Sequence, residues 1–233
     1  MGIKENIEEI KRNIALAAEK AGRAPEEIQL VGATKMNGAD RVREAIAAGL
    51  TICGENRVQE LREKYEQGAY EGARLHFIGH LQKNKVKYLV GTAELIHSVD
   101  STGLMDEIHR KALEKGIVQD ILLEINVAGE SAKSGFAPED CARAISHAAA
   151  LSGLRVRGLM AVPPICADGE ENRPYFELVR KLFIDNSKEK YDNICMDFMS
   201  MGMSGDYLTA IECGANMIRI GSAIFGQRIY PQR

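Results

Sequence analysis

The sequence contains no tryptophan, and its 233 residues include only six prolines and five cysteines. The cysteines lie far apart and form no C-x-x-C pair. An odd number of dispersed cysteines fits neither a disulfide framework nor a zinc site. The five histidines are equally scattered and make no H-E-x-x-H motif. We therefore expect free thiols, as in a reducing cytoplasm, and no bound metal.

A basic excess and a long hydrophobic run are also missing. The net charge of -3 leaves no positive surplus to neutralise phosphates, which argues against a nucleic-acid partner. No apolar stretch approaches the roughly 18 residues that a membrane span requires. The N-terminal "MGIKENIEEIKRN" is too charged for a signal peptide. These absences favour a cytoplasmic protein with no membrane partner.

Isoleucines recur at helical spacing near the N-terminus, at Ile3, Ile7, Ile10 and Ile14. This spacing predicts an amphipathic helix whose apolar face is buried. The pattern ends in the segment "AGRAP", where glycine and proline interrupt it. We expect a helix within residues 1–22 that packs on the rest of the fold.

Beyond this helix, eight short apolar runs alternate with helical patterns. The runs occupy residues 28–35, 51–55, 74–79, 94–99, 119–127, 154–162, 195–201 and 217–224. Eight strands alternating with helices predict a closed (β/α)8 TIM barrel, an α/β fold, as a single domain over residues 1–233. A doubly wound open sheet is the rival, but it usually has fewer strands, and no G-x-G-x-x-G or G-x-x-x-x-G-K-[ST] motif is present.

The helical patterns between these runs give further expectations. One predicted buried face comprises Leu104, Ile108, Ala112 and Leu113. Glycines stand where helix C-caps belong, at Gly49, Gly116, Gly153 and Gly214.

Polar side chains follow most of the predicted strands at their carboxyl ends. They are Lys35, Glu55, Asn56, His80, Ser98, Asp100, Asn126, Ser200 and Arg219. In a (β/α)8 barrel the active site lies at this end of the strands. We therefore expect these side chains to meet at one barrel mouth.

The last two predicted strands carry small residues and hydroxyls, in "SMGMSGD" (200–206) and "RIGSAIFG" (219–226). The loops after strands seven and eight are the recurrent phosphate site of this fold. A helix starting near Gly205 would direct its positive end toward an anion. Arg219 supports this interpretation, because an arginine inside a barrel needs an anionic or polar partner.

Lys35 ends the first predicted strand, across the mouth from that candidate phosphate site. A phosphorylated aldehyde would suit both features. An unperturbed lysine has a pKa of about 10.4, so losing its proton at pH 7 costs roughly 4–5 kcal/mol. Partial burial and the nearby cation Arg219 both lower that pKa. We expect Lys35 to be suited to imine formation.

At this point the motifs resemble a known family, the pyridoxal phosphate homeostasis proteins, also called proline synthase co-transcribed homologues. The motifs are "GENRVQEL" (54–61), "HFIGHLQKNK" (76–85), "KSGF" (133–136), "GLMAVPP" (158–164), "SMGMSGD" and "RIGSAIFG". The resemblance covers nearly the whole chain. It implies a barrel similar to that of alanine racemase, with pyridoxal 5′-phosphate (PLP) bound as a Schiff base to Lys35.

The same resemblance implies the remaining cofactor-binding residues. The phosphate would be held by Ser200, Met201, Gly202, Gly221 and Ser222, with Asn56 beside the ring and Arg219 facing the pyridine nitrogen. The chain departs from the family in three places. Met36 and Asn37 replace a frequent proline after the lysine, Gly205 replaces a frequent acidic residue, and Ser222 replaces a frequent threonine. We expect altered geometry in the loop after Lys35.

The sequence leaves open whether the protein catalyses a reaction. An arginine cannot donate its proton, so the pyridine nitrogen would stay neutral and the ring would be a weak electron sink. A racemase also needs a second acid or base, for which Tyr207, His80 and Tyr230 are the nearest candidates. We expect a PLP-binding protein without robust catalysis. An amino-acid racemase with an open active-site face is the alternative, and a class I aldolase-like barrel is a weaker third.

The resemblance also implies partners. The protein would act in vitamin B6 homeostasis, limiting free PLP, with apo PLP-dependent enzymes as candidate recipients. The alanine racemase dimer depends on a second domain that we expect to be missing here, so we expect a monomer.

Overall fold

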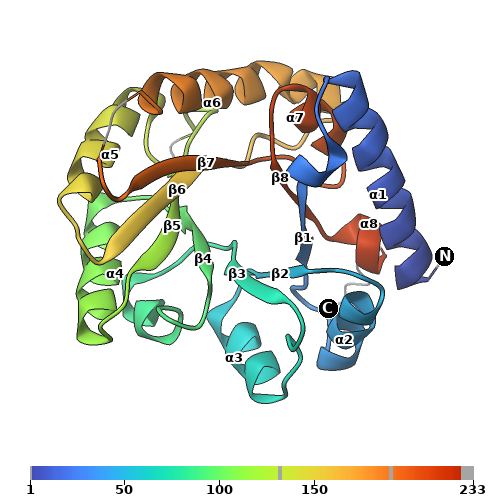
Figure 1. Cartoon of the computed structure of the whole chain (residues 1–233), viewed down its shortest axis with the longest axis horizontal. Helices are drawn as coiled ribbons and strands as arrows, with labels where there is room; N and C mark the ends of the chain where they lie inside the picture. The colour runs from blue at the N-terminus through green and yellow to red at the C-terminus, as the bar shows by residue number, and fades with distance from the viewer. Residues whose placement is uncertain (1, 131–132, 189–190, 227–233) are drawn as a thin grey trace.

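The strands form one closed parallel barrel. The computed structural model describes residues 2–130, 133–188 and 191–226, and within them the strands follow one another around the ring from β1 to β8 (Figure 1). They are β1 (Gln29–Ala33), β2 (Ile52–Glu55), β3 (Arg74–Phe77), β4 (Leu95–Val99), β5 (Gln119–Ile125), β6 (Leu154–Ala161), β7 (Ile194–Ser200) and β8 (Met217–Ile220). Pairing of β8 with β1 closes the ring. The predicted (β/α)8 barrel is confirmed.

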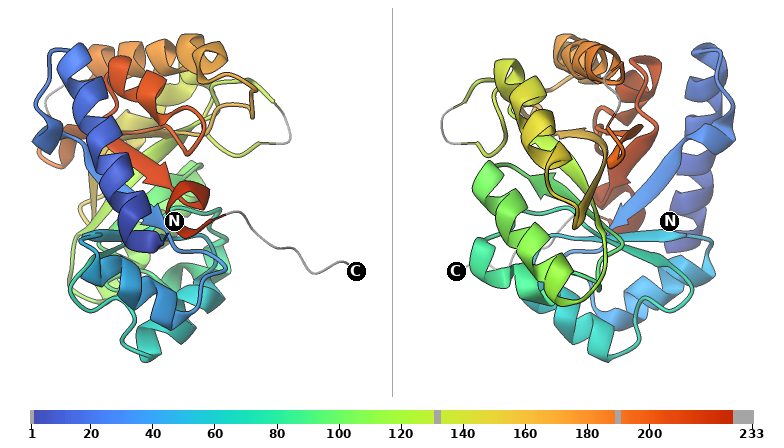
Figure 2. Two further views of the ribbon diagram at one scale, coloured as in Figure 1. Left: turned by 90° about the vertical axis from the view of Figure 1, so that its right-hand side faces the viewer. Right: turned by 60° about the vertical axis from the view of Figure 1, so that its left-hand side comes forward.

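Helices cover the outside of the barrel, as two further views show (Figure 2). They are α1 (Ile3–Lys20), α2 (Ala39–Ala47), α3 (Val58–Glu66), α4 (Thr102–Glu114), α5 (Cys141–Ala149), α6 (Arg173–Asn186), α7 (Tyr207–Glu212) and α8 (Ser222–Phe225). Four 3-10 segments accompany them: η1 (Pro25–Glu27), η2 (Lys83–Tyr88), η3 (Pro138–Asp140) and η4 (Gly169–Asn172). Only η2 connects β3 to β4, where a barrel normally has a full helix.

The N-terminal helix α1 packs beside the C-terminal helices α7 and α8, as the left view of Figure 2 shows. Its four predicted isoleucines are all buried. The Asn6 side chain donates a hydrogen bond to the carbonyl of Ile224 in α8, with an N–O distance of 2.9 Å. Helix α1 therefore joins the N-terminal segment to helices α7 and α8 on one side of the barrel.

The barrel interior is a separate apolar cluster from the layer between strands and helices. Its members are Val31, Ala33, Ile52, Ile78, Leu95, Leu122, Met160 and Met217. Successive side chains of a strand point to opposite faces. Val31 and Ala33 face the interior, so the same alternation places Lys35 on the inward side above them. Met217 also faces the interior, so Arg219, two residues later, faces inward as well. Inward-facing residues at the strand ends thus form the barrel mouth.

Two sequence expectations on the helices are wrong. Leu113 is 54% exposed, because it follows Ala112 directly and therefore lies about 100° around the helix from that buried residue. Gly153 is not a C-cap: α5 ends at Ala149, and Gly153 lies just before β6 without a positive φ. Its small size instead lets the turn approach His109, whose ring nitrogen accepts the Gly153 N–H.

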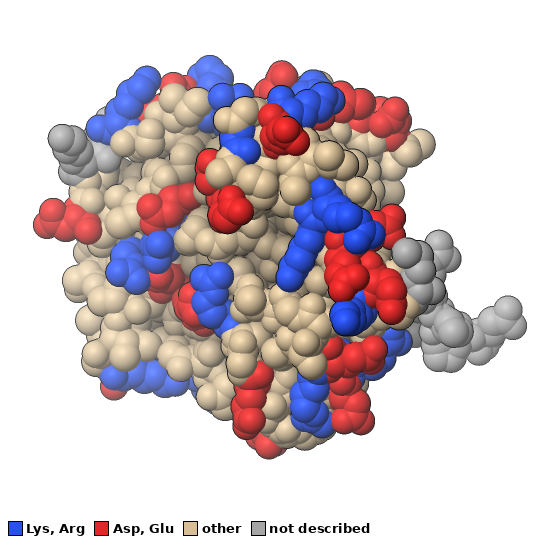
Figure 3. All heavy atoms as spheres, turned by 45° about the vertical axis from the view of Figure 1, so that its right-hand side comes forward, with Lys and Arg blue, Asp and Glu red and all other residues tan. Residues whose placement is uncertain are grey.

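The surface carries mixed charge. Acidic and basic side chains are interspersed over the face shown in Figure 3. Within the described part of the chain, no helix is both long and apolar enough to cross a membrane.

Candidate functional site at the barrel mouth

Lys35 lies two residues after β1 and is half-buried. The next residue, Met36, has a φ of +62°, and among the described residues it is the one non-glycine residue with positive φ. Such a conformation costs about 1–3 kcal/mol in an L-residue and needs support from its surroundings. The loop after Lys35 therefore has an unusual backbone conformation.

Arg219 lies inside the barrel on β8, with 5% of its surface exposed. Its guanidinium donates to the Ser200 carbonyl and hydroxyl, both at 2.6 Å, and to the Ala161 carbonyl at 2.8 Å. Burial lowers the pKa of Arg219 to about 10, although the negative charge of Glu124 acts in the opposite direction and raises it. A guanidinium has five N–H groups, so two remain for a ligand.

A line of hydrogen bonds leads from Arg219 into the barrel. Ser200 Oγ lies 3.0 Å from His97 Nδ1, and His97 Nε2 lies 3.0 Å from His76 Nδ1. Burial lowers the pKa of His76 to about 3 and that of His97 well below its ordinary value. Both rings are thus neutral, and the Ser200 hydroxyl is occupied by Arg219 and His97 rather than directed into the loop after β7.

The loops after β7 and β8 offer backbone groups to the mouth. The Gly202 carbonyl accepts the backbone N–H of Arg219 at 3.0 Å, which fixes the loop after β7 to strand β8. Within the described residues, no hydrogen bond is found for the backbone N–H of Gly202 or of Ser222, the first residue of α8. Helix α7 begins at Tyr207, two residues later than the predicted start near Gly205. These N–H groups are available to an anion.

A cavity of about 240 Å³ opens on the other side of the mouth. It is lined by Asn56, Ile78, Gly79, His80, Ser98, Glu124, Ile125, Asn126, Lys133, Ser134, Met160 and Val162. The Oδ1 atoms of Asn56 and Asn126 are buried and have no hydrogen-bond partner among the described residues. A buried acceptor without a partner is costly. The cavity therefore favours a ligand, or ordered water, that can donate hydrogen bonds.

Glu124 in this cavity was missed by the sequence reasoning. Burial, reinforced by the charge of Asp100, raises the pKa of Glu124 to about 7. The alternation within β5 could have found it, because Leu122 faces the interior and Glu124 follows two residues later. It is a carboxyl group able to gain or lose a proton near neutral pH.

His80 lies at the exposed rim of the cavity. Its Nδ1 is 3.4 Å from Asp100 Oδ2 and 3.1 Å from Ser134 Oγ. Both contacts use the same ring nitrogen, whereas a serine–histidine–aspartate relay needs one on each nitrogen. These three residues therefore form no catalytic triad.

Not every predicted polar residue reaches the mouth. Glu55 is fully buried on the outer side of β2, bonded to Lys64 and Tyr70, because Asn56 faces inward and its neighbour must face outward. Burial raises the pKa of Tyr207, whose hydroxyl bonds to Asn13 in α1. Tyr230 lies outside the described residues. No group of three or more metal-ligating side chains occurs in the described ranges.

The comparisons with known proteins first define the class. The alanine racemase N-terminal domain family matches residues 6–229. This chain is therefore an alanine-racemase-type barrel, as its fold and strand-end lysine indicate. An alanine racemase from Clostridium difficile shares the fold at a TM-score of 0.73 and 16% identity, over 99% of this chain and 57% of that one.

Full-length relatives narrow the class to one family. A pyridoxal phosphate homeostasis protein from Aquifex aeolicus is 43% identical, over 97% of this chain and 98% of the relative. Its namesake from Escherichia coli (strain K12) is 34% identical, over 99% of each. The chain belongs to the pyridoxal phosphate homeostasis protein family. PipY of Synechococcus elongatus, solved with PLP bound, matches at a TM-score of 0.79 and 32% identity, over 91% of this chain and 100% of that one.

The residues at the mouth fit PLP. The cofactor has a phosphate, a ring nitrogen and an aldehyde, and the mouth supplies a counterpart for each. Backbone N–H groups in the glycine loops suit the phosphate, Arg219 has two N–H groups left, and Lys35 carries an amine. The unpartnered oxygen of Asn56 also requires a donor.

Proposed function

We propose that this chain binds PLP at the barrel mouth as a Schiff base on Lys35 and acts in intracellular PLP homeostasis. The observation that carries the proposal is one of placement. Lys35 follows β1, and β1 pairs with β8, which bears Arg219 and leads into Gly221 and Ser222. The names of the relatives and the PLP bound to PipY support the same ligand.

Each group has a defined task in this proposal. When bound, PLP supplies the reactive aldehyde carbon and the phosphate anchor. Lys35 provides the attacking amine. The loops holding Met201 and Gly202, together with Gly221 and Ser222, surround the phosphate. Ser200 contributes by holding Arg219, which orients the ring nitrogen, because its own hydroxyl and carbonyl are bonded to that guanidinium.

Borohydride reduction followed by peptide mass mapping tests the assignment. Reduction fixes a pyridoxyl group on whichever lysine holds PLP. A modified Lys35 also blocks tryptic cleavage, so the adduct is expected on the peptide of residues 24–41. Lys35→Ala should lose both the adduct and the visible absorbance of bound PLP. The exposed Lys83→Ala is the matched control and should keep both. An adduct elsewhere, or none after PLP is added, would overturn the proposal.

The absence of robust catalysis is also part of the proposal. Arg219 cannot protonate the ring nitrogen, and its hydrogen bonds commit it to Ser200 and Ala161. Tyr207 is turned toward α1 and is not a candidate for the open face. The loaded protein should therefore exchange the Cα proton of added amino acids for deuterium no faster than free PLP does.

One observation favours the alternative, an amino-acid racemase with an open face. Glu124 lines the cavity and titrates near neutral pH, as a general base requires. Under this alternative, deuterium exchange would be fast in the loaded protein and would be lost in Glu124→Gln while bound PLP absorbance persisted. Slow exchange in both proteins would exclude it.

We further propose that the protein is a cytoplasmic monomer that passes PLP to apo PLP-dependent enzymes. The cysteines support a reducing compartment, since Cys53, Cys141, Cys166, Cys195 and Cys213 are all free. Light scattering of the loaded protein should give a mass near 25.6 kDa. Transfer should restore an apo-enzyme faster than PLP release into solution allows. Equal rates would leave simple release as the route.

A further inference from the structure

The segment that carries Lys35 is fixed by side chains from β2 and α3. The peptide group before Lys35 is bonded through the Thr34 carbonyl, which accepts from Lys64 Nζ at 2.8 Å. The peptide group after Lys35 is bonded through the Met36 N–H, which donates to Glu60 Oε2 at 2.7 Å. The Lys35 carbonyl, which belongs to the same peptide group, accepts from the Asn37 side chain at 3.1 Å. Both backbone torsions of Lys35 are therefore constrained from outside the mouth.

An ion cluster, defined here as the buried Glu55 and Lys64 with the half-buried Glu60, provides these contacts. Lys64 Nζ lies 2.5 Å from Glu55 Oε1 and 3.5 Å from Glu60 Oε2. Glu55 Oε1 also accepts from the Thr34 hydroxyl at 2.6 Å and from Tyr70 at 3.0 Å. The cluster thus reaches the residue before Lys35 through two bonds and the residue after it through one.

This arrangement is expensive if its role is stability alone. Glu55 is fully buried, Lys64 is 6% exposed, and Glu55 Oε2 has no partner among the described residues. Burying two charges is rarely a net gain, and an apolar pair of similar volume is often as stable. A role in placing Lys35 explains why charges stand where apolar residues would suffice.

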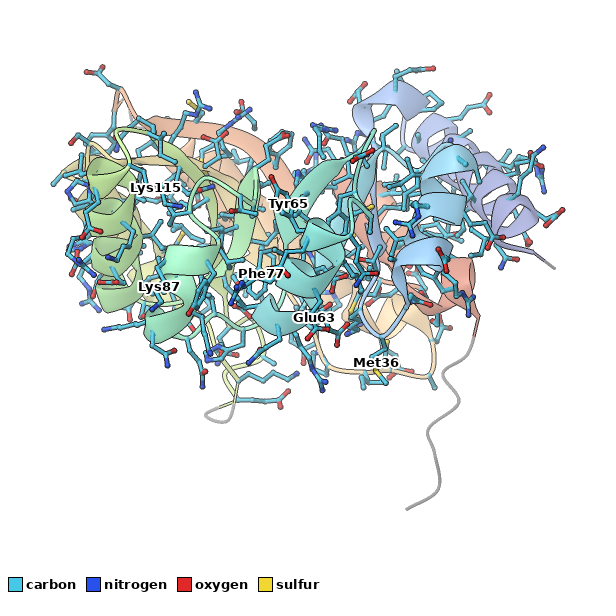
Figure 4. The ribbon with its side chains drawn as sticks, turned by 90° about the horizontal axis from the view of Figure 1, so that it is seen from below. Met36, Glu63, Tyr65, Phe77, Lys87 and Lys115 are labelled. Atoms are coloured by element: carbon cyan, nitrogen blue, oxygen red, sulfur yellow. The ribbon has the colours of Figure 1, made fainter. Side chains whose placement is uncertain are left out.

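The cluster also maintains the strained turn. Met36 has a φ of +62°, and its N–H is held by Glu60. Figure 4 labels Met36 on the loop after β1 and Glu63 on α3, the helix that supplies Glu60 and Lys64. Without Glu60 the turn can relax toward an ordinary conformation, which would move the Lys35 side chain.

We propose that Glu55, Glu60 and Lys64 are positioning residues that hold Lys35 in the geometry for Schiff-base formation with PLP. This inference rests on the proposed function of Lys35. A precisely placed amine depends on the groups that fix its backbone. Loss of the cluster should therefore weaken PLP capture while leaving the barrel folded.

The first test compares two substitutions of one residue. Glu60→Ala removes the acceptor of the Met36 N–H, whereas Glu60→Gln keeps an acceptor oxygen. Glu60→Ala should lower PLP affinity and the rate of borohydride labelling at Lys35 by about tenfold or more. Glu60→Gln should stay near wild type. Glu63→Ala, an exposed change on the same helix, is the matched control.

The second test removes the buried charges together. Glu55→Leu combined with Lys64→Met avoids leaving one charge unpaired, although the Tyr70 hydroxyl loses its acceptor, so the melting temperature of the apo protein should fall much less than in Lys64→Met alone. Its labelling rate and PLP affinity should nevertheless fall. Should Lys64→Met alone fail to fold, the double variant still decides the question.

The outcomes separate this inference from the proposed function. If wild type is not labelled at Lys35, the proposed function itself fails. If wild type is labelled, and Glu60→Ala and the double variant bind and react with PLP as it does, the positioning role is overturned. Reduced binding that follows melting temperature in every variant, Glu60→Gln included, would also overturn it.

Discussion

At the scale of single residues, Arg219 connects the barrel interior to the mouth. Its three hydrogen bonds are short and buried, and a lysine could make only part of this planar pattern. Arg219→Lys should leave a buried carbonyl unsatisfied and lower the free energy of unfolding of the apo protein by about 1–3 kcal/mol. Urea denaturation measures this, with the exposed Arg143→Lys as control. Equal stability of the wild type, Arg219→Lys and Arg143→Lys would contradict this prediction.

Glu124 predicts a pH dependence of stability. The folded protein keeps the Glu124 proton up to about pH 7, whereas the carboxyl ordinarily releases it near 4.5. The folded state binds more protons in this window, so Glu124 makes the free energy of unfolding fall as the pH rises from about 4.5 to 7. Glu124→Gln removes this contribution, which is about 3 kcal/mol.

The measurement for Glu124 is a difference between two profiles. His76 and His97 produce the opposite slope, because the unfolded chain protonates them as the pH falls below 6.5 while the folded protein does not. Subtracting the wild-type profile from that of Glu124→Gln cancels them. The variant should gain stability relative to wild type between pH 5 and pH 8. Parallel profiles would show that Glu124 titrates normally.

At the scale of elements, the turn from β7 to α7 depends on Gly202. Its φ is +93°, and a Cβ would lie 2.6 Å from Ala210 Cβ. Gly202→Ala should therefore destabilise the protein by about 1–3 kcal/mol and weaken PLP binding. Gly205→Ala lies in the same loop, with ordinary φ and open space, and should change stability by less than about 1 kcal/mol. Equal effects in thermal unfolding would contradict the assignment.

The sequence predicted elements better than it predicted contacts. The strands appeared as apolar runs because their composition is local, and the barrel followed from their number and order. The hydrogen bonds of Ser200 could not be predicted, because His97 lies 103 residues away and meets it only across the closed barrel. The position of Glu55 could have been predicted, because Asn56 faces inward and its neighbour in β2 must face outward. The bond from Lys64 to the Thr34 carbonyl, beside Lys35, could not be predicted, because the two residues lie 30 positions apart in the sequence.

At the scale of the whole molecule, α1 packs across the C-terminal part of the barrel, next to the pairing of β8 with β1 that closes it. The Arg23 guanidinium, just beyond its end, donates to the Ala215 carbonyl before β8 at 2.7 Å, while Asn6 reaches Ile224 at the other end. Contacts at both ends of β8 mean that α1 and the proposed PLP site should unfold together. The predicted single domain over residues 1–233 therefore requires one cooperative transition.

A substitution in α1 and the addition of PLP provide two independent tests of cooperative unfolding. Ile7 is fully buried, so Ile7→Ala should lower the free energy of unfolding by about 2–5 kcal/mol. Leu16→Ala, at a position 65% exposed, should change it little. PLP at 100 times its Kd should add about 2.7 kcal/mol to either variant and nothing to Lys35→Ala. Circular dichroism should show one transition that both changes move. A separate early transition in Ile7→Ala, with PLP shifting only the later one, would make α1 an appendage rather than part of the cooperative barrel.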